Sequence, residues 1–146
     1  MKNLLPGIAI VMLSAHAGAA SLITDSEARL PEVVEGKPRA VTRAITRGPG
    51  IRVVSPDPAA TIKSPFNLKV AFEPRGGAKI VPGTVSVTYL KSPSVDLLDR
   101  IRPGISEQGI DLANAEVPPG EHRIQMSLED SEGRKTTTVI MLNVGK

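Results

Sequence analysis

The sequence predicts an all-β protein built as a single antiparallel β-sandwich of six to eight strands. Three observations support this fold class. Several segments after residue 50 alternate apolar and polar residues with a period of two, as a strand with one buried and one solvated face requires. The 13 Pro and 13 Gly residues follow no period, which excludes collagen and argues against long helices. The length of 146 residues suits one ordinary domain.

An export signal is predicted over residues 1–20. Lys2 supplies one positive charge, an apolar stretch runs from Leu4 to Leu13, and small residues follow it. This order is typical of a secretory signal peptide, and about ten apolar residues are too few to span a bilayer. Cleavage is favoured after Ala20, with cleavage after Ala19 as the alternative. We therefore expect an exported bacterial protein, either periplasmic or secreted.

Residues 21–50 are predicted to form a flexible N-terminal segment with one short helical turn. Residues 24–27, Thr-Asp-Ser-Glu, have the pattern of a capping box, and Pro31 ends the turn. Three arginines follow at a spacing of four residues, Arg39, Arg43 and Arg47. On a helix they would form a stripe able to bind an anionic partner, and a basic linker is the alternative. The three arginines are candidate interaction residues.

Residues 51–146 are predicted to form the sandwich. Strands are expected at 51–55, 66–73, 84–90, 122–129 and 136–144, with a short one at 60–62. Their alternation directs one set of side chains into the core, namely Leu68, Val70, Phe72, Val85, Val87, Tyr89, Ile124, Met126, Leu128, Ile140, Leu142 and Val144. Because two of the three aromatic residues belong to this set, an exposed aromatic platform for stacking on sugars or bases is not expected.

Between Lys91 and Pro119 the pattern is less regular. A helical turn is expected at 96–101, and a short hairpin at 105–112 that turns at Gln108–Gly109. Functional loops are commonly carried by rigid strands, so this segment is the best candidate for an interaction surface. The apolar residues that a partner could cover are Leu97, Leu98, Ile101 and Ile105. The alternative is that they close the open end of the sandwich.

Turn motifs resemble those of bacterial secreted immunoglobulin-like (cadherin-like) domains. They are Ile-Arg-Val-Val-Ser-Pro at 51–56, Pro-Pro-Gly at 118–120 before the penultimate strand, and Asp-x-x-Gly at 130–133 between the last two strands. The resemblance covers residues 51–146 and implies an immunoglobulin-like sandwich without the core Cys and Trp of antibody domains. Such modules serve as spacers, adhesion domains or accessory binding domains, and no role transfers residue by residue.

Composition excludes several classes of function. The chain has no cysteine, which excludes a disulfide scaffold, a zinc ribbon and a cysteine nucleophile. Loss of Lys2 with the signal lowers the formal net charge from +3 to +2, too little to indicate nucleic-acid binding. After the signal no segment is apolar enough to span a membrane, and neither a cofactor nor an oligomeric state is specified.

No catalytic residue and no metal ligand is assigned. His122 is the one histidine left after signal removal, and the chain offers no Gly-x-Ser-x-Gly elbow to present a serine to it. The acidic stretch 129–133 could offer oxygens to calcium, but Asp130 and Gly133 also suit a type I turn. Residues 75–79, with Gly-Gly at their centre, are interpreted as a turn between strands rather than a phosphate loop.

These observations predict an exported, non-enzymatic binding or assembly module that serves an unknown envelope or secreted protein. Two alternatives remain open. One is a calcium-stabilised structural or adhesion module, and the other is a small hydrolase that uses His122.

Overall fold

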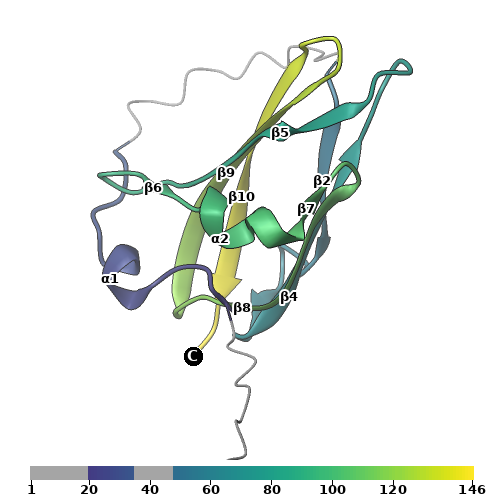
Figure 1. The fold of residues 1–146 in the computed structure, drawn as a ribbon. Coiled ribbons are helices and arrows are strands. Elements are labelled where there is room, and N and C mark those ends of the chain that lie inside the picture. The colour runs from purple at the N-terminus through teal and green to yellow at the C-terminus, as the bar shows by residue number, and fades with distance from the viewer. Residues whose placement is uncertain (1–19, 35–47) are drawn as a thin grey trace, which may run out of the picture.

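The computed structural model describes residues 20–34 and 48–146, and β-strands dominate it (Figure 1). The elements are β1 (Ala20–Ser21), α1 (Asp25–Ala28), β2 (Gly50–Ser55), β3 (Thr61–Ile62), β4 (Phe66–Glu73), β5 (Ile80–Tyr89), β6 (Val95–Asp96), α2 (Leu98–Ile101), the 3-10 helix η1 (Arg102–Gly104), β7 (Ile105–Ser106), β8 (Gly109–Glu116), β9 (Gly120–Asp130) and β10 (Lys135–Val144). The prediction of an all-β fold is confirmed for the described residues.

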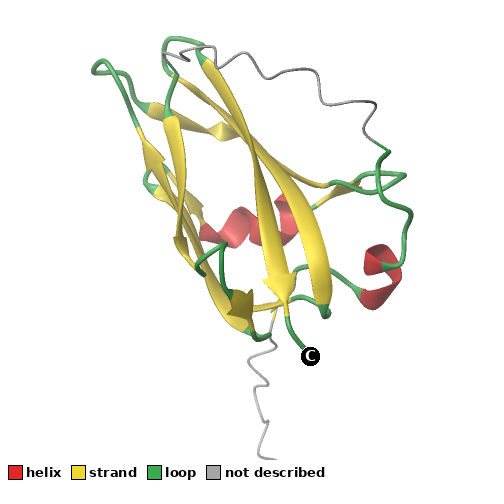
Figure 2. Ribbon diagram, turned by 180° about the vertical axis from the view of Figure 1, so that it is seen from behind, coloured by secondary structure: helices red, strands yellow, loops and turns green. Residues whose placement is uncertain are grey.

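The strands form two five-stranded sheets that face each other, hereafter the sandwich. One sheet has the order β1-β8-β4-β2, with β7 also paired with β8, and the other has the order β3-β10-β9-β5-β6. Figure 2 shows the two layers from behind, with α2 visible in the space between them. The long strands pair antiparallel, whereas β1 pairs with β8 and β3 with β10 in parallel. These two short strands therefore depart from the antiparallel pairing that the sequence predicts for the sandwich.

The period of two identifies the core correctly. All twelve side chains predicted to point inward are buried, from Leu68 in β4 to Val144 in β10. They belong to one continuous hydrophobic cluster that joins the two sheets. Full burial of a large aliphatic side chain stabilises a fold by about 1.5–3 kcal/mol, so this cluster supplies the main driving force for folding.

The bounds of the predicted strands match the structure within two residues except in β5, whereas β8 (Gly109–Glu116) extends four residues beyond the hairpin predicted at 105–112. The prediction for β4 matches the observed Phe66–Glu73, but β5 begins at Ile80, four residues before the predicted start. Its register against β9 shifts between Val81 and Ser86, where Pro82 and Gly83 interrupt the alternation. The Thr84 hydroxyl bridges this gap, since it donates to the Val81 carbonyl (2.7 Å) and accepts from the Glu129 amide (2.9 Å).

The N-terminal strap, residues 20–34, corrects the prediction of a flexible segment over 21–50. Leu22 and Ile23 are 1% and 2% exposed and belong to the core cluster. Their amides both donate to the Glu116 carbonyl, at 2.9 and 3.3 Å, which continues the pairing of β1 with β8. Residue 50, assigned to the same segment, already begins β2. The strap is therefore part of the sandwich, while residues 35–47 lie outside the described residues.

The capping box predicted at Thr24 is confirmed. The Thr24 hydroxyl accepts from the Glu27 amide at 3.3 Å, and a carboxylate oxygen of Glu27 accepts from the Thr24 amide at 2.9 Å. This exchange satisfies two amides that α1 leaves without an intrahelical partner. It fixes the path of the chain between the buried Ile23 and the helix.

The irregular segment folds into α2 and the β7–β8 hairpin. The helical turn forms as predicted but is confined to 98–101, and the hairpin turns at Glu107–Gln108, one residue before the predicted position. Gly109 opens β8 with a φ of +153°, and a Cβ there would lie 1.9 Å from the Val70 carbonyl oxygen. Only glycine allows β8 to approach β4 this closely.

The predicted signal lies almost entirely outside the described residues, because the description begins at Ala20. Within the described residues, none of the helices has the length and apolar character needed to cross a membrane.

Candidate functional site

The predicted interaction surface divides into buried and accessible residues. Leu97 and Ile101 are fully buried in the core cluster, so a partner cannot cover them, and their assignment to a surface is wrong. They close the open end of the sandwich, which was the alternative. Leu98 and Ile105 are half-buried and line a groove on the outside of the same segment.

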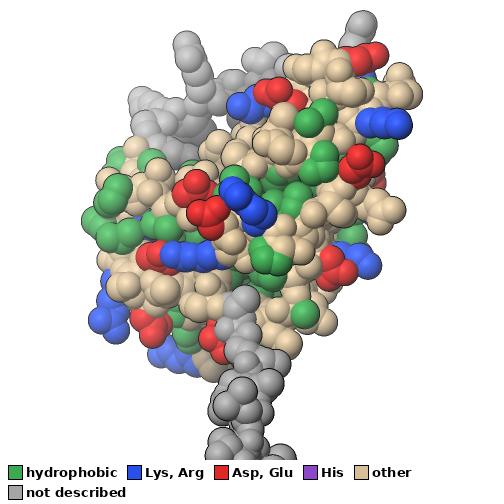
Figure 3. All heavy atoms as spheres, in the orientation of Figure 1, with side chains coloured by type: hydrophobic (Ala, Val, Ile, Leu, Met, Phe, Trp, Pro, Cys, Tyr) green, Lys and Arg blue, Asp and Glu red, His purple; other side chains and the backbone are tan. Residues whose placement is uncertain are grey.

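This apolar groove lies between β5 on one side and α2, η1 and β7 on the other. It encloses about 430 Å³ and is lined by Pro82, Gly83, Val85, Leu98, Arg102 and Ile105. In Figure 3 hydrophobic side chains gather in the middle of the face, over the space between β5 and α2. Charged side chains surround them, so the groove is an apolar hollow with a polar rim.

Short local contacts fix α2 against β5. The Leu97 amide donates to the Val87 carbonyl at 2.9 Å, which ties the start of α2 to β5 and turns Leu97 into the core. A carboxylate oxygen of Asp96 accepts from the Leu98 amide at 2.8 Å. On the rim, Arg102 pairs with Asp99 at 3.0 Å, with side chains 67% and 90% exposed. Such an exposed pair adds little stability.

The other predicted interaction residues are not described. Arg39, Arg43 and Arg47 lie in the segment 35–47, so the structure does not test the arginine stripe.

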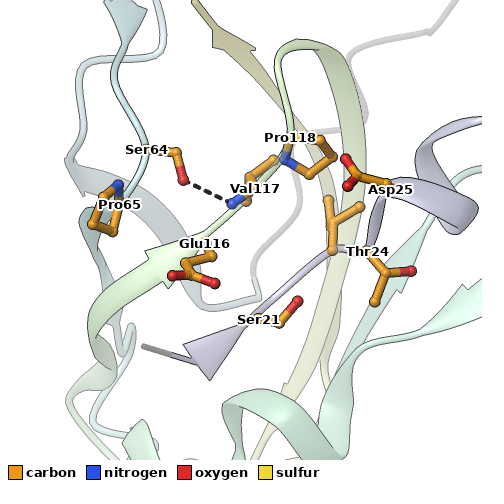
Figure 4. Close-up of a pocket in the computed structure, with 9 residues that line it drawn as sticks. Ser21, Thr24, Asp25, Ser64, Pro65, Glu116, Val117 and Pro118 are labelled. Carbon is orange, nitrogen blue, oxygen red and sulfur yellow. Dashed lines mark hydrogen bonds between the residues drawn. The ribbon is translucent and has the colours of Figure 1, made fainter. Parts of the chain in front are cut away.

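A second, polar groove lies at the end of the sandwich where the strap meets β8. It encloses about 400 Å³ (Figure 4). Its lining comes from β1, the start of α1, the β3–β4 connection and the end of β8, and consists of Ser21, Ile23, Thr24, Asp25, Ser64, Pro65, Glu116, Val117 and Pro118. The Ser64 hydroxyl accepts from the Val117 amide at 3.0 Å, which holds the two connections together. Two carboxylates, Asp25 and Glu116, give this groove an acidic character.

An ion pair clamps the strap to α2. The Arg100 guanidinium donates to both carboxylate oxygens of Glu27, at 2.6 and 2.7 Å, and also to the Leu22 carbonyl at 2.9 Å. The hydrogen bonds from Arg100, followed by those from Thr24, lower the pKa of Glu27 to about 2 against the effect of burial. Glu27 therefore stays charged, and it caps α1 and binds α2 at once.

A buried polar network joins the strap to the second sheet. Lys91 is 5% exposed, pairs with Glu32 of the strap, and has its ammonium 5.5 Å from the centre of the Tyr89 ring. Burial lowers the pKa of Lys91, but the bond with Glu32 and the neighbouring Tyr89 outweigh it and raise that pKa overall. The ammonium is consequently retained inside the protein with a partner on each side.

His122 completes this network. Its Nε2 lies 2.7 Å from the Pro118 carbonyl oxygen, which can only accept, so we assign the proton to Nε2. Nδ1 then accepts from the Tyr89 hydroxyl at 2.8 Å. Burial lowers the pKa of His122, and the Lys91 charge lowers it further. Both ring nitrogens are thus occupied by structural partners, which leaves the imidazole without a free nitrogen to act as a base.

The Asp130 turn binds its own backbone. One carboxylate oxygen accepts from the amides of Glu132 and Arg134, each at 3.0 Å, and the other accepts from Arg134 Nε at 2.8 Å. Burial raises the pKa of Asp130, but these hydrogen bonds lower it overall. Both carboxylate oxygens of Asp130 are therefore engaged within the turn. Over residues 20–34 and 48–146, no three His, Cys, Asp or Glu side chains come together as a metal site.

The sequence did not predict the N-terminal strap, the ion pair between Glu27 and Arg100, or the buried network around Lys91. A signal for the strap exists in the capping box, because Ile23 before Thr24 and Ala28 after it form the pattern of a hydrophobic staple, and both pack on the core. The partners Arg100 and Lys91 have no such signal. They lie more than 50 residues from Glu27 and Glu32 in sequence, and only the fold brings them together.

Comparison of the chain with protein-family models, with curated proteins and with solved structures finds no match in any of the three. Its function must therefore be inferred from its own residues and geometry.

Proposed function

We propose that this protein is an exported, immunoglobulin-like binding or assembly module of the bacterial envelope. It works by recognition and performs no covalent chemistry. Export is supported by the charge, apolar stretch and small residues of the N-terminus. The recognition role is supported above all by the apolar groove between β5 and α2.

The immunoglobulin-like assignment is supported by strand order. The long strands β2, β4 and β8 share one sheet, and β10, β9 and β5 share the other. Along these long strands the chain therefore passes between the sheets after β4, between β5 and β8, and after β8, as it does in Greek-key sandwiches. The turn motifs at 118–120 and 130–133 occupy the connections on either side of β9, as the sequence resemblance implies.

The groove fits an aliphatic segment of a partner protein. Leu98, Ile105 and Val85 provide an apolar floor, and Arg102 at the rim offers a charge for a carboxylate. Specific interfaces commonly combine a desolvated apolar centre with a polar rim. Because the walls are strands and a helix fixed to the core, the site is largely preformed and costs little to order on binding.

Affinity capture with matched variants tests this function. The mature protein, Leu98→Asp/Ile105→Asp and the control Val139→Asp would each be incubated with the solubilised envelope fraction. Val139 is 47% exposed and lies on β10, which β9 separates from the groove wall on β5, so the control adds a charge away from the groove. A partner retained by the wild type and the control but lost by the groove variant, with unchanged melting temperatures, supports the proposal. Equal retention by all three overturns it.

A further inference from the structure

The strap is attached to the sandwich in two different ways. Its proximal part, residues 20–28, contributes Leu22 and Ile23 to the hydrophobic core, and Ala28 packs against that core. Its distal part, residues 29–34, contributes none of the residues of this cluster and runs past β6 (Figure 1). The distal strap is therefore held by contacts of another kind.

Two polar contacts join the distal strap to the connection between β5 and β6. The Ser92 amide donates to the Pro31 carbonyl at 2.9 Å, and the Lys91 ammonium pairs with the Glu32 carboxylate. Because Lys91 is only 5% exposed, its charge depends on this partner for compensation. The attachment of the distal strap thus depends on the charge balance around Lys91.

His122 belongs to the same network. Its Nδ1 accepts from the Tyr89 hydroxyl at 2.8 Å, and the centre of the Tyr89 ring lies 5.5 Å from the Lys91 ammonium. Its Nε2 donates to the Pro118 carbonyl at 2.7 Å. Burial raises the pKa of Tyr89, so the hydroxyl retains the proton that it donates to the imidazole. The neutral ring therefore fits its surroundings as one donor and one acceptor.

Protonation of His122 upsets this balance. The charged groups that act on the ring are Lys91 and Glu32, while Leu142, its partner on β10, is apolar. With a neutral ring the network holds one cation and one anion. A protonated ring adds a second cation beside a buried ammonium, and its Nδ1 can no longer accept from Tyr89. Burial and the Lys91 charge accordingly lower the pKa of His122 in the folded protein.

Detachment of the distal strap relieves the conflict. Once Glu32 leaves, Lys91 can turn its long side chain into water, and water reaches the ring. His122 then takes up a proton as readily as in an unfolded chain, so acid favours the detached state. The proximal strap keeps its contact between Glu27 and Arg100 under the same conditions, because the pKa of Glu27 is about 2.

We propose that the distal strap is a pH-dependent element, which His122 releases from the β5–β6 connection in mildly acidic surroundings while the proximal strap stays in the core. This regulation goes beyond the proposed binding role. It needs no ligand, since the proton itself is the signal.

Amide hydrogen exchange of the full chain, residues 1–146, tests this release at about pH 8 and about pH 5.5. The Ser92 amide, bonded to Pro31, reports on the distal strap, and the Leu22 and Ile23 amides report on the proximal strap. After correction for the intrinsic pH dependence of exchange, the protection of Ser92 should fall by about three- to tenfold in acid, with tenfold as the ceiling because the ordinary pKa of histidine is 6.5. Protection of Leu22 and Ile23 should not change. Constant protection of Ser92, or an equal loss at all three amides, would overturn the proposal.

His122→Gln is the matched variant. Glutamine also offers one donor and one acceptor but takes up no proton, so the Ser92 amide should lose no protection in acid. Because the variant retains Glu32, it separates the titration of His122 from that of any carboxylate. An acid loss at Ser92 as large as that of the wild type would show that another group is responsible and would overturn the role of His122.

Glu32→Gln keeps the proposal testable if His122→Gln does not fold. It leaves the Lys91 ammonium without its anion, so the protection of Ser92 should already be low at about pH 8, with that of Leu22 and Ile23 retained. Wild-type protection of Ser92 in this variant would mean that the ion pair does not hold the distal strap, and would overturn the proposed mechanism.

Discussion

The long strands and the N-terminal strap reach the same core by different means. In β4, in the middle of β9 and in the second half of β10, every second side chain is apolar, so the local sequence specifies which face of the strand is buried. The strap has no such period. It contributes Leu22 and Ile23 to the core and is held by Arg100 and Lys91, both from the segment between β5 and β7.

The strap is therefore ordered by tertiary contacts rather than by a local alternation of apolar and polar residues. A strand contributes many weak, repeated contacts, while the strap depends on two side chains and two ion pairs. Substitution of single residues tests each of these contacts separately.

The largest effect is expected for Ile23→Ala. It should lower the free energy of unfolding by about 2–5 kcal/mol, because it leaves a cavity in a packed core. Leu142→Ala in β10, equally buried, should cost a similar amount. Val34→Ala is the control, since Val34 is 91% exposed and should cost almost nothing. Urea denaturation of the three variants measures the comparison. An Ile23→Ala protein as stable as the control would mean that the strap is only loosely attached.

The strap clamp should fail in acid. Glu27→Gln should destabilise the protein by about 1–3 kcal/mol at pH 7, because a charged, bidentate contact with Arg100 is lost. The pKa of Glu27 in the folded state, about 2, lies below its ordinary value of 4.5, so its contribution to stability is complete above pH 4.5 and disappears as the pH falls towards 2. The stability difference between wild type and variant should shrink across that window. A difference that stays constant from pH 6 to pH 2 would contradict the role given to Glu27.

A smaller effect is expected from His122 at milder pH. The folded state holds its pKa below 6.5, so the unfolded chain takes up the proton first. The stability that neutral His122 contributes is complete above about pH 6.5 and is lost as pH falls through the folded pKa. The groups that face the ring are Tyr89, Lys91, Glu32 and the Pro118 carbonyl. Denaturation between pH 8 and pH 5 should therefore show a decline that His122→Gln lacks. Parallel curves for the two proteins would contradict this.

No effect is expected from calcium. Because Asp130 already accepts from two amides and from Arg134, melting curves with calcium and with a chelator should coincide. A higher midpoint with calcium would revive the alternative of a calcium-stabilised module.

The predictability of the fold follows the same contrast. The alternation of apolar and polar residues in 66–73 and 122–129 identified both strands and their buried faces, because burial of one face of a sheet requires apolar side chains at alternate positions. The capping box at Thr24 was also predictable, since it is complete within four residues. The sequence did not indicate which of Leu97 and Leu98 is buried. The hydrogen bond from the Leu97 amide to the Val87 carbonyl turns Leu97 inward, and this contact forms only in the folded protein. The apolar groove was thus half predicted, from Leu98 and Ile105, and its wall on β5 was not.

Amide hydrogen exchange of the chain that begins at Ser21 tests the central claim, that the strap is part of the folded core. The account predicts that the amides of Leu22 and Ile23, bonded to the Glu116 carbonyl, exchange as slowly as those of β8. The Ser92 amide, bonded to the Pro31 carbonyl of the strap, should be protected with them. Exchange of these amides at the rate of an unstructured peptide, while β4, β9 and β10 remain protected, would contradict it.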